Sequence, residues 1–193
     1  AISKFSTSFA SGSLTEGSFT LLASGSKRDT VTQLPGSPVA SKAFDIHNGV
    51  TGVAKVWEGG GPITGTSIKS LSLEIDNALR GQEAIGTLGY EGIGVGTFSV
   101  KGSIEVYFAD GTMYDKFLND AYTSFTLSTQ DTAGNGYIIT VPRANLVSGK
   151  IQAGSKDADL MASFQYEAYG DMGNADPTLR KTIFIDRVGV AVS

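Results

Sequence analysis

The sequence contains no cysteine and only one histidine, His47. The missing cysteine excludes a disulfide framework, a thiolate metal site and a cysteine nucleophile. A catalytic triad or a histidine metal cluster would have to be built around His47, and no Gly-x-Ser-x-Gly motif accompanies it. We therefore expect His47, with Asp45 and Asn48 close by in the chain, to be a loop residue. The sequence predicts no catalytic residue, no cofactor and no metal site.

Long apolar runs and concentrated positive charge are also missing. No apolar segment approaches the ~20 residues that a membrane-spanning helix needs. The formal net charge is −4, and the largest basic clusters are the pairs Lys27-Arg28 and Arg180-Lys181. Proteins that bind nucleic acid gain much of their affinity by neutralising phosphates. The sequence therefore argues against a membrane partner and against sequence-specific binding of DNA.

The clearest positive signal is the alternation of polar and apolar residues over 96–111, GTFSVKGSIEVYFADG. A period of two is typical of a β-strand with one buried and one exposed face. The same alternation occurs over residues 67–79 and 160–169. On the polar faces of these three predicted strands lie Ser70, Ser72, Glu74, Asp76, Ser99, Lys101, Ser103, Glu105, Ser163, Gln165 and Glu167.

A glycine-rich segment separates the first two of these strands. Glycine tolerates backbone conformations that other residues avoid, so residues 81–96 are expected to form a long loop that is either mobile or tightly folded. We consider this loop a candidate contact between subunits, and the alternative is a plain flexible hairpin. The candidate contact residues are Gly81, Gly86, Gly89, Tyr90, Gly92, Gly94 and Gly96.

The remaining signals complete a mainly β fold. Thr112 and Asp115 resemble a capping box that begins a short helix, TMYDKFLND. A hairpin is expected over 124–146, where Pro142 indicates an edge position or a bulge, and a further strand over 181–192. The pieces predict an antiparallel β-sandwich or barrel with one short α-helix and long loops. Residues 1–66 are expected to form a Ser/Thr/Gly-rich β segment or arm, and residues 67–193 the main β domain.

From about residue 67 onward, the order of several motifs resembles the tail tube (major tail) proteins of long-tailed bacteriophages. These motifs are Asn-x-Leu-Arg at 77–80 before LGYEGIGVGTF, then YDKFLN at 114–119, ITVPRANLVSG at 139–149 and KDADLMASFQYEA at 156–168. Residues 1–66 carry little of the resemblance.

The resemblance implies a structural virion protein that forms hexameric rings. The rings would stack into a hollow tail, with a sheet of each subunit joining its neighbours in an inner β-barrel. It also implies that the tube encloses a tape-measure protein during assembly in the host cytoplasm, contacts the tail tip and terminator proteins, and conducts viral DNA during ejection. On this interpretation the polar residues of the three strands face the lumen, where Glu74, Asp76, Glu105 and Glu167 would repel phosphates.

Other interpretations stay open. The polar faces are also explained by simple solvation of a sheet. A tube protein of a contractile tail or of a secretion machine would share the rings and the hollow barrel. A carbohydrate-binding β-sandwich on the virion surface should show an exposed aromatic cluster, which the sequence does not reveal. An enzyme is the weakest alternative, since a glycosidase cleft usually carries several aromatic residues and the chain has one tryptophan, Trp57.

Overall fold

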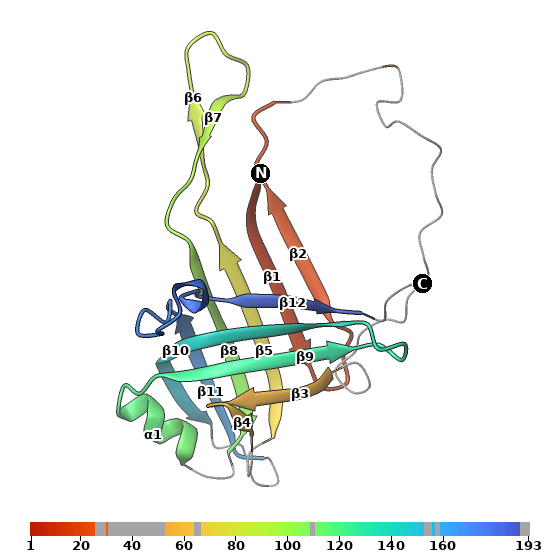
Figure 1. Ribbon diagram of the computed structural model, residues 1–193, viewed down its shortest axis with the longest axis vertical. Coiled ribbons are helices and arrows are strands. Elements are labelled where there is room, and N and C mark those ends of the chain that lie inside the picture. Colours follow the sequence, from red (N-terminus) through yellow and green to blue (C-terminus); the bar gives the residue numbers. More distant parts are fainter. Residues whose placement is uncertain are drawn as a thin grey trace.

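Figure 1 shows the fold in a computed structural model, which describes residues 1–25, 30, 53–63, 67–108, 111–152, 156 and 159–189. His47 and the Lys27-Arg28 pair lie outside the described residues. The strands are β1 (Ile2–Ala10), β2 (Glu16–Leu21), β3 (Val53–Glu58), β4 (Gly61–Pro62), β5 (Ile68–Asp76), β6 (Arg80–Glu83), β7 (Tyr90–Gly94), β8 (Ser99–Tyr107), β9 (Thr123–Gln130), β10 (Gly136–Gln152), β11 (Met161–Ala168) and β12 (Phe184–Val188). The helices are α1 (Thr112–Leu118) and a 3-10 turn, η1 (Pro177–Leu179).

One antiparallel sheet, in the order β2-β1-β5-β8-β11-β10-β9-β3-β4, bends into two layers. The strands β1, β2, β5, β8 and β11 form one layer, and β9, β10, β12 and β3 run across it (Figure 1). Strand β10 belongs to both layers, because its first half pairs with β9 and β12 and its second half with β11. The predicted antiparallel sandwich with one short α-helix is confirmed, and the described sheet is not closed into a barrel.

Pro142 lies in β10 near the place where this strand passes from one layer to the other. The pairing of β10 with β9 shifts register between Val141 and Ala144. Proline has no N–H to donate to a strand ladder, so it is tolerated where the ladder is interrupted. The expectation of an edge or a bulge at Pro142 is therefore confirmed, and the bulge is the form it takes.

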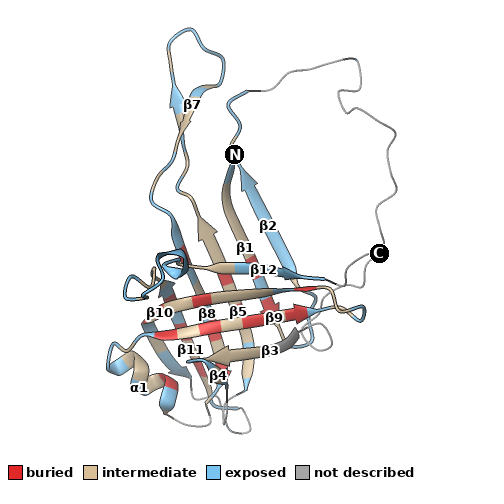
Figure 2. Ribbon diagram, in the orientation of Figure 1, coloured by how far each residue is buried: buried red, intermediate tan, exposed pale blue. Residues whose placement is uncertain are grey.

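The core lies between the two layers and is built from the apolar sides of the three predicted strands. Leu73, Val100, Ile104, Phe164 and Tyr166 are all almost fully buried. Phe125, Leu127 and Val141 of the other layer pack in the same cluster. Figure 2 shows these buried positions gathered where the layers cross, whereas β2 is exposed and no residue of the β6–β7 hairpin is buried. The alternation thus assigned the buried face correctly.

The helix α1 begins at Thr112, as expected, but the predicted capping box does not form. Gly111 is the N-terminal cap and no side chain caps the helix. The helix is capped one residue earlier than expected. The backbone N–H of Asp115 donates to the carbonyl oxygen of Gly111, so Thr112 is already the first helical residue and cannot act as the cap. Met113 is buried against the core, while Leu118 at the end of the helix is exposed.

Strands from residues 1–66 pair directly with strands from residues 67–193. Strand β1 pairs with β5 along its length, and β2 pairs with β1 on the other side. The first two strands therefore extend the same layer that contains β5, β8 and β11, and the sheet is continuous across the expected boundary at residue 66.

Candidate functional site

The polar sides of β5, β8 and β11 form one continuous surface, because these strands are neighbours in the sheet. In the central row, Ser72 lies opposite Ser103, which lies opposite Gln165. The other rows on the same face are Ser70, Glu105 and Ser163, then Glu74, Lys101 and Glu167, and finally Asp76 with Ser99. The structure thus brings all the candidate lumen residues together on one face of one layer.

The same face continues over β1 and β2, which the sequence analysis did not include. Ser6 lies opposite Glu74 and Ser8 opposite Ser72. In β2, Ser18 lies opposite Ser6 and Glu16 opposite Ser8. The signal was present in the sequence, since Lys4, Ser6 and Ser8 alternate with Phe5, Thr7 and Phe9 in the stretch KFSTSF.

At the other side, the face continues onto the second half of β10. Ser148 lies opposite Gln165, and Lys150 lies opposite Ser163. From β2 to the second half of β10, the polar face therefore crosses the whole layer. We call this surface, from Glu16 and Ser18 to Ser148 and Lys150, the polar face.

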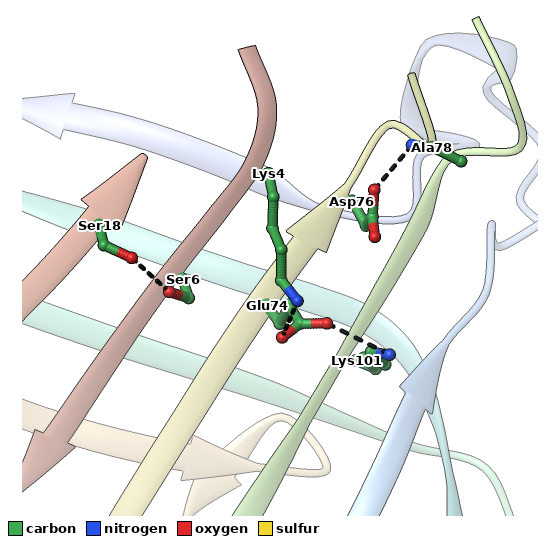
Figure 3. A network of polar contacts seen from close by, with 7 residues as sticks. All are labelled: Lys4, Ser6, Ser18, Glu74, Asp76, Ala78 and Lys101. Carbon is green, nitrogen blue, oxygen red and sulfur yellow. Dashed lines mark hydrogen bonds and ion pairs between the residues drawn. The ribbon is translucent and has the colours of Figure 1, made fainter. Parts of the chain in front are cut away.

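Hydroxyl groups on the polar face bind one another across the strands. The Oγ atoms of Ser72 and Ser103 are 2.8 Å apart. Those of Ser6 and Ser18 are 2.9 Å apart (Figure 3). The backbone N–H of Ser103 also donates to the Oγ atom of Ser72 at 2.9 Å. Because these small side chains satisfy one another, the surface between the strands offers few strong anchors to a passing molecule.

Two of the acidic residues of the polar face, Glu74 and Glu105, are paired with lysines. The Nζ atom of Lys4 lies 2.7 Å from one carboxylate oxygen of Glu74, and that of Lys101 lies 3.2 Å from the other (Figure 3). Hydrogen bonding from Lys4, reinforced by Lys101, holds the pKa of Glu74 below its usual value. Lys69 lies 3.3 Å from Glu105. The polar face is therefore rich in hydroxyls, and lysines neutralise part of its acidic charge.

The two remaining acids of the predicted set accept hydrogen bonds from their own surroundings. Asp76 accepts one from the backbone N–H of Ala78 at 2.7 Å, at the turn where Ala78 has a φ of 46°. Glu167 accepts one from the phenol of Tyr169 at 3.1 Å, and this bond raises the pKa of Tyr169. Both carboxylates stay exposed enough to contribute negative charge to the polar face.

At each side of the layer, the outermost strand has one edge without a partner strand among the described residues. Among the described strands, β2 pairs with β1 alone, and all of its residues are exposed. Beyond Ala144, β10 pairs with β11 on one side, and no strand of the described chain covers its other side. Open edges of this kind present unpaired N–H and C=O groups and are templates for pairing with another chain.

The glycine-rich segment is a two-stranded hairpin that projects beyond the other strands (Figure 1). Its strands β6 and β7 pair from Arg80 with Gly94 to Glu83 with Tyr90. The segment is thus folded, with Gly81, Gly92 and Gly94 in the ladder, Gly86 and Gly89 at the turn, and Gly96 at the return to the body. Whether it contacts another subunit stays a prediction.

At two of these positions, the structure explains why the residue is glycine. The ring of Tyr90 lies over Gly81, where an added Cβ would come within 2.2 Å of the ring. Gly89 has a φ of 94°, which a residue with a side chain rarely adopts. Its neighbour Tyr90 donates its backbone N–H to the carbonyl of Ser24 at 3.1 Å, so the hairpin is attached to the chain that follows β2.

Two exposed tyrosines form a small aromatic group beside Glu167, at the margin of the polar face. The rings of Tyr122 and Tyr169 meet edge to face, 6.3 Å apart. The guanidinium of Arg143 lies 3.8 Å from the centroid of the Tyr122 ring and covers one side of it. Sugar-binding sites use open aromatic faces for stacking, so this arrangement does not favour the carbohydrate-binding alternative.

Within the described ranges, no three His, Asp or Glu side chains gather in a way that could hold a metal ion. None of the described helices has the length and apolar character required to cross a membrane.

Comparison with protein families gives one clear result. A family profile described as phage tail tube protein matches residues 1–168. The match includes β1 and β2, so it extends into the N-terminal segment that carries little of the resemblance seen in the sequence. Comparison with curated proteins gives no match. Because the family match covers most of the 193 residues, the chain belongs to the phage tail tube protein family and is a structural component of the virion tail.

Proposed function

We propose that copies of this chain join edge to edge into hexameric rings, and that the rings stack into a tube whose lumen is lined by the polar face. Viral DNA would pass through this lumen during ejection, after a tape-measure protein has occupied it during assembly. The hexameric count and the lumen contents come from the family resemblance. The edge-to-edge arrangement is supported by the direction of the strands.

The observation that carries the proposal is the opposite direction of the two open edges. The strands of the layer alternate in direction from β2 through β1, β5, β8 and β11 to the second half of β10, because every pairing is antiparallel. The outermost strands, β2 and β10, therefore run in opposite directions. Placing β2 of one copy beside β10 of the next continues the antiparallel pattern without interruption, and a closed ring leaves no open edge.

Charge at the two edges is complementary. The polar side of β2 carries Glu16 near one end, and the polar side of β10 carries Lys150. Across the strands of the layer, the pairing connects Glu16 through Ser72 to Ser148. Lys150 lies two residues beyond Ser148 on the same side of β10. If β2 of one copy pairs with β10 of the next with a register shift of two residues, Glu16 and Lys150 lie opposite each other. A sheet of tilted strands needs such register shifts to close into a barrel.

A hydroxyl-rich lining suits a conduit. DNA binds proteins mainly through lysine and arginine residues that neutralise its phosphates. On the polar face, Lys4, Lys69 and Lys101 already have carboxylate partners, so they are less available to phosphates. A passing duplex would meet paired hydroxyls, lysines that already hold carboxylates, and further acids that repel phosphates, which favours sliding over binding.

The direct test is electron microscopy of the concentrated protein together with native mass spectrometry of the same sample. Hollow tubes with sixfold end views, or rings of six copies, are the expected result. A compact dimer or trimer whose mass does not change with concentration would contradict the proposal. The negative control is Leu21→Pro in β2. Leu22 donates its N–H to the carbonyl of Ala1 in β1, so the N–H of Leu21 points to the open side, where a proline blocks pairing with a further strand. This variant should form neither rings nor tubes.

A further inference from the structure

The tip of the β6–β7 hairpin carries two apolar side chains that are not covered by the described part of the chain. Ile85 and Leu88 are fully exposed, at 107% and 100% of their reference accessible areas. The tip between Glu83 and Glu91, AIGTLGY, contains no charged residue. Isolated exposed leucines are common, but two fully exposed apolar residues on one projecting turn are typical of a contact surface.

A groove of matching chemistry lies elsewhere on the same molecule. It has a volume of about 690 Å³ and lies between the layers, where they diverge beyond the core. Its walls include Phe5 and Phe19 on one side and Ile75, Tyr137, Ile139 and Ile185 around the other, and none of the described residues that line it is charged. Phe19, Tyr137 and Ile185 are each about half exposed or more, so apolar surface is left open to water.

The hairpin cannot fill the groove of its own chain. Ile75 and Asn77, which line the groove, come directly before the hairpin, and the paired strands β6 and β7 lead away from the body (Figure 1). From Asn77 to Ile85 the extended chain reaches up to about 28 Å. Folding back would break the ladder from Arg80–Gly94 to Glu83–Tyr90. None of the described segments of the chain fills the groove, and the hairpin of a second copy is free to enter it.

The charges around the tip and the groove favour a second copy of this chain. Glu83 and Glu91 flank the apolar tip. Arg187 follows Ile185 on the same side of β12 and lies opposite Tyr137, which places it at an end of the groove. An uncharged tip would thus enter an uncharged groove, with an acid of the hairpin stem near an arginine at the rim.

We propose that the β6–β7 hairpin of one copy inserts Ile85 and Leu88 into the groove between β1–β2 and β10–β12 of another copy. A protrusion and a groove at different places on one molecule form a heterologous contact, which builds open assemblies of many copies. The partner copy lies displaced along the hairpin and to its side. The inference rests on the proposed tube, in which copies in successive rings are displaced along the axis, and it names the contact that would hold them together.

Disulfide formation between introduced cysteines tests the contact. The chain has no native cysteine, so every disulfide must involve an introduced one. Leu88→Cys protein is mixed with Phe19→Cys protein, concentrated, oxidised mildly and analysed by mass spectrometry. A disulfide requires Cα atoms within about 7 Å, so a heterodimer reports a direct contact. The matched control is Leu118→Cys on α1, which is 61% exposed, close to the 62% of Phe19. We call the disulfide-linked dimers by the two positions that they join. The expected result is a clear excess of the 88–19 product over the 88–118 product.

A second measurement uses soluble variants and does not depend on disulfide geometry. The double variant Ile85→Ser with Leu88→Ser should fold normally, because both side chains are fully exposed. We expect its self-association, measured by analytical ultracentrifugation, to be at least about tenfold weaker. Met172→Ser, at a residue that is 69% exposed outside the groove, should associate like the unmodified chain.

The outcomes separate this contact from the proposed tube. Tubes that contain the 88–19 product support both, and tubes in which residue 88 links only to residue 118 overturn the groove contact while leaving the tube intact. Small closed oligomers that contain the 88–19 product support the groove contact and contradict the tube. Absence of the 88–19 product together with unchanged association of the double variant overturns the inference.

Discussion

The ammonium of Lys4 in β1 lies 2.7 Å from the carboxylate of Glu74 in β5, and the same carboxylate also pairs with Lys101 in β8. One acid therefore connects three neighbouring strands across the polar face. It also joins the N-terminal strand to the two strands that the sequence indicates most clearly. The alignment of β1 with β5 is thereby fixed by charge as well as by backbone pairing.

We predict that Glu74→Gln lowers the free energy of unfolding by about 0.5–1 kcal/mol at neutral pH, the usual range for a partly exposed ion pair. The folded-state pKa of Glu74 is lowered, so its stabilising contribution is complete above the unfolded-state pKa and is lost as the pH falls through the folded value. The variant should therefore lose less stability than the unmodified chain between neutral and acid pH. Urea unfolding at both pH values measures the difference.

The control for this prediction is Glu83→Gln on the exposed hairpin. Glu83 is a carboxylate on a strand as well, but it has no lysine partner among the described residues. Its replacement removes a carboxylate without breaking an ion pair among the described residues, so it should lower the free energy of unfolding much less than Glu74→Gln does. Equal effects of the two variants would contradict the role assigned to the Lys4–Glu74 pair.

Gly102 is predicted to be irreplaceable in β8. A Cβ at this position would come within 2.0 Å of the carbonyl oxygen of Ser72 and 2.6 Å of the Tyr166 hydroxyl. Gly102→Ala should therefore destabilise the fold by about 1–3 kcal/mol, as overpacking of a core does. Chemical denaturation measures the loss. Gly61→Ala, where an added Cβ meets nothing within 4 Å, is the matched control and should change stability little.

Tyr166 provides a second pH-dependent test, at the alkaline end. Its hydroxyl donates to the Ser72 carbonyl at 2.9 Å, and burial raises the pKa of the phenol above its usual value of about 10. Because the folded-state pKa is raised, the contribution of Tyr166 to stability is complete below the unfolded value and is lost as the pH rises above it. We expect tyrosinate absorbance to show one tyrosine that ionises only when the chain unfolds.

Tyr166→Phe is the reference for that titration. The delayed absorbance change should be missing in this variant, while the earlier changes stay the same. Loss of the hydrogen bond should also cost about 1 kcal/mol of unfolding free energy. A delayed change that persists in the phenylalanine variant would mean that another tyrosine is responsible.

The sequence predicted the layer of β5, β8 and β11 well because alternation with a period of two reports directly on which side chains are buried. Leu73, Val100 and Phe164 occupy the core as expected. The extension over β1 was missed, although Lys4, Ser6 and Ser8 alternate in the same way, because Thr7 interrupts the apolar side with a hydroxyl. That hydroxyl donates to the Glu16 carbonyl at 2.8 Å, a partner that only the fold reveals.

The ion pairs of the polar face could not be predicted from strand patterns alone. Lys4 and Glu74 are far apart in sequence, and their meeting depends on the order and register of the strands. Lys69 reaches Glu105 because the pairing of β5 with β8 shifts register between Ile68 and Ser70. A register shift of this kind moves a residue to the opposite face, and no local pattern announces it.

The complementary edges predict a charge-swap experiment on ring formation. Glu16→Lys places a lysine opposite Lys150 of the next copy, so rings or tubes should form at least about tenfold less readily in native mass spectrometry. Lys150→Glu should do the same, because two acids then face each other. The double variant restores the pair with its signs reversed, and assembly should return. Failure of the double variant to assemble better than either single variant would contradict this join.

The last prediction concerns the passage of DNA. Glu105 and Glu167 lie on the polar face, and replacing both by lysine adds positive charge to the proposed lumen in every subunit of every ring. Unpaired lysines would bind phosphates as the duplex moves, so DNA release from triggered virions should slow several-fold. High salt should reduce the difference, because it screens these contacts. Asp186→Lys on β12, an exposed acid of the other layer, is the control and should leave the release rate unchanged. Equal release rates for the lumen variant and the unmodified virion, at low salt and with intact tails, would remove these residues from the path of the DNA.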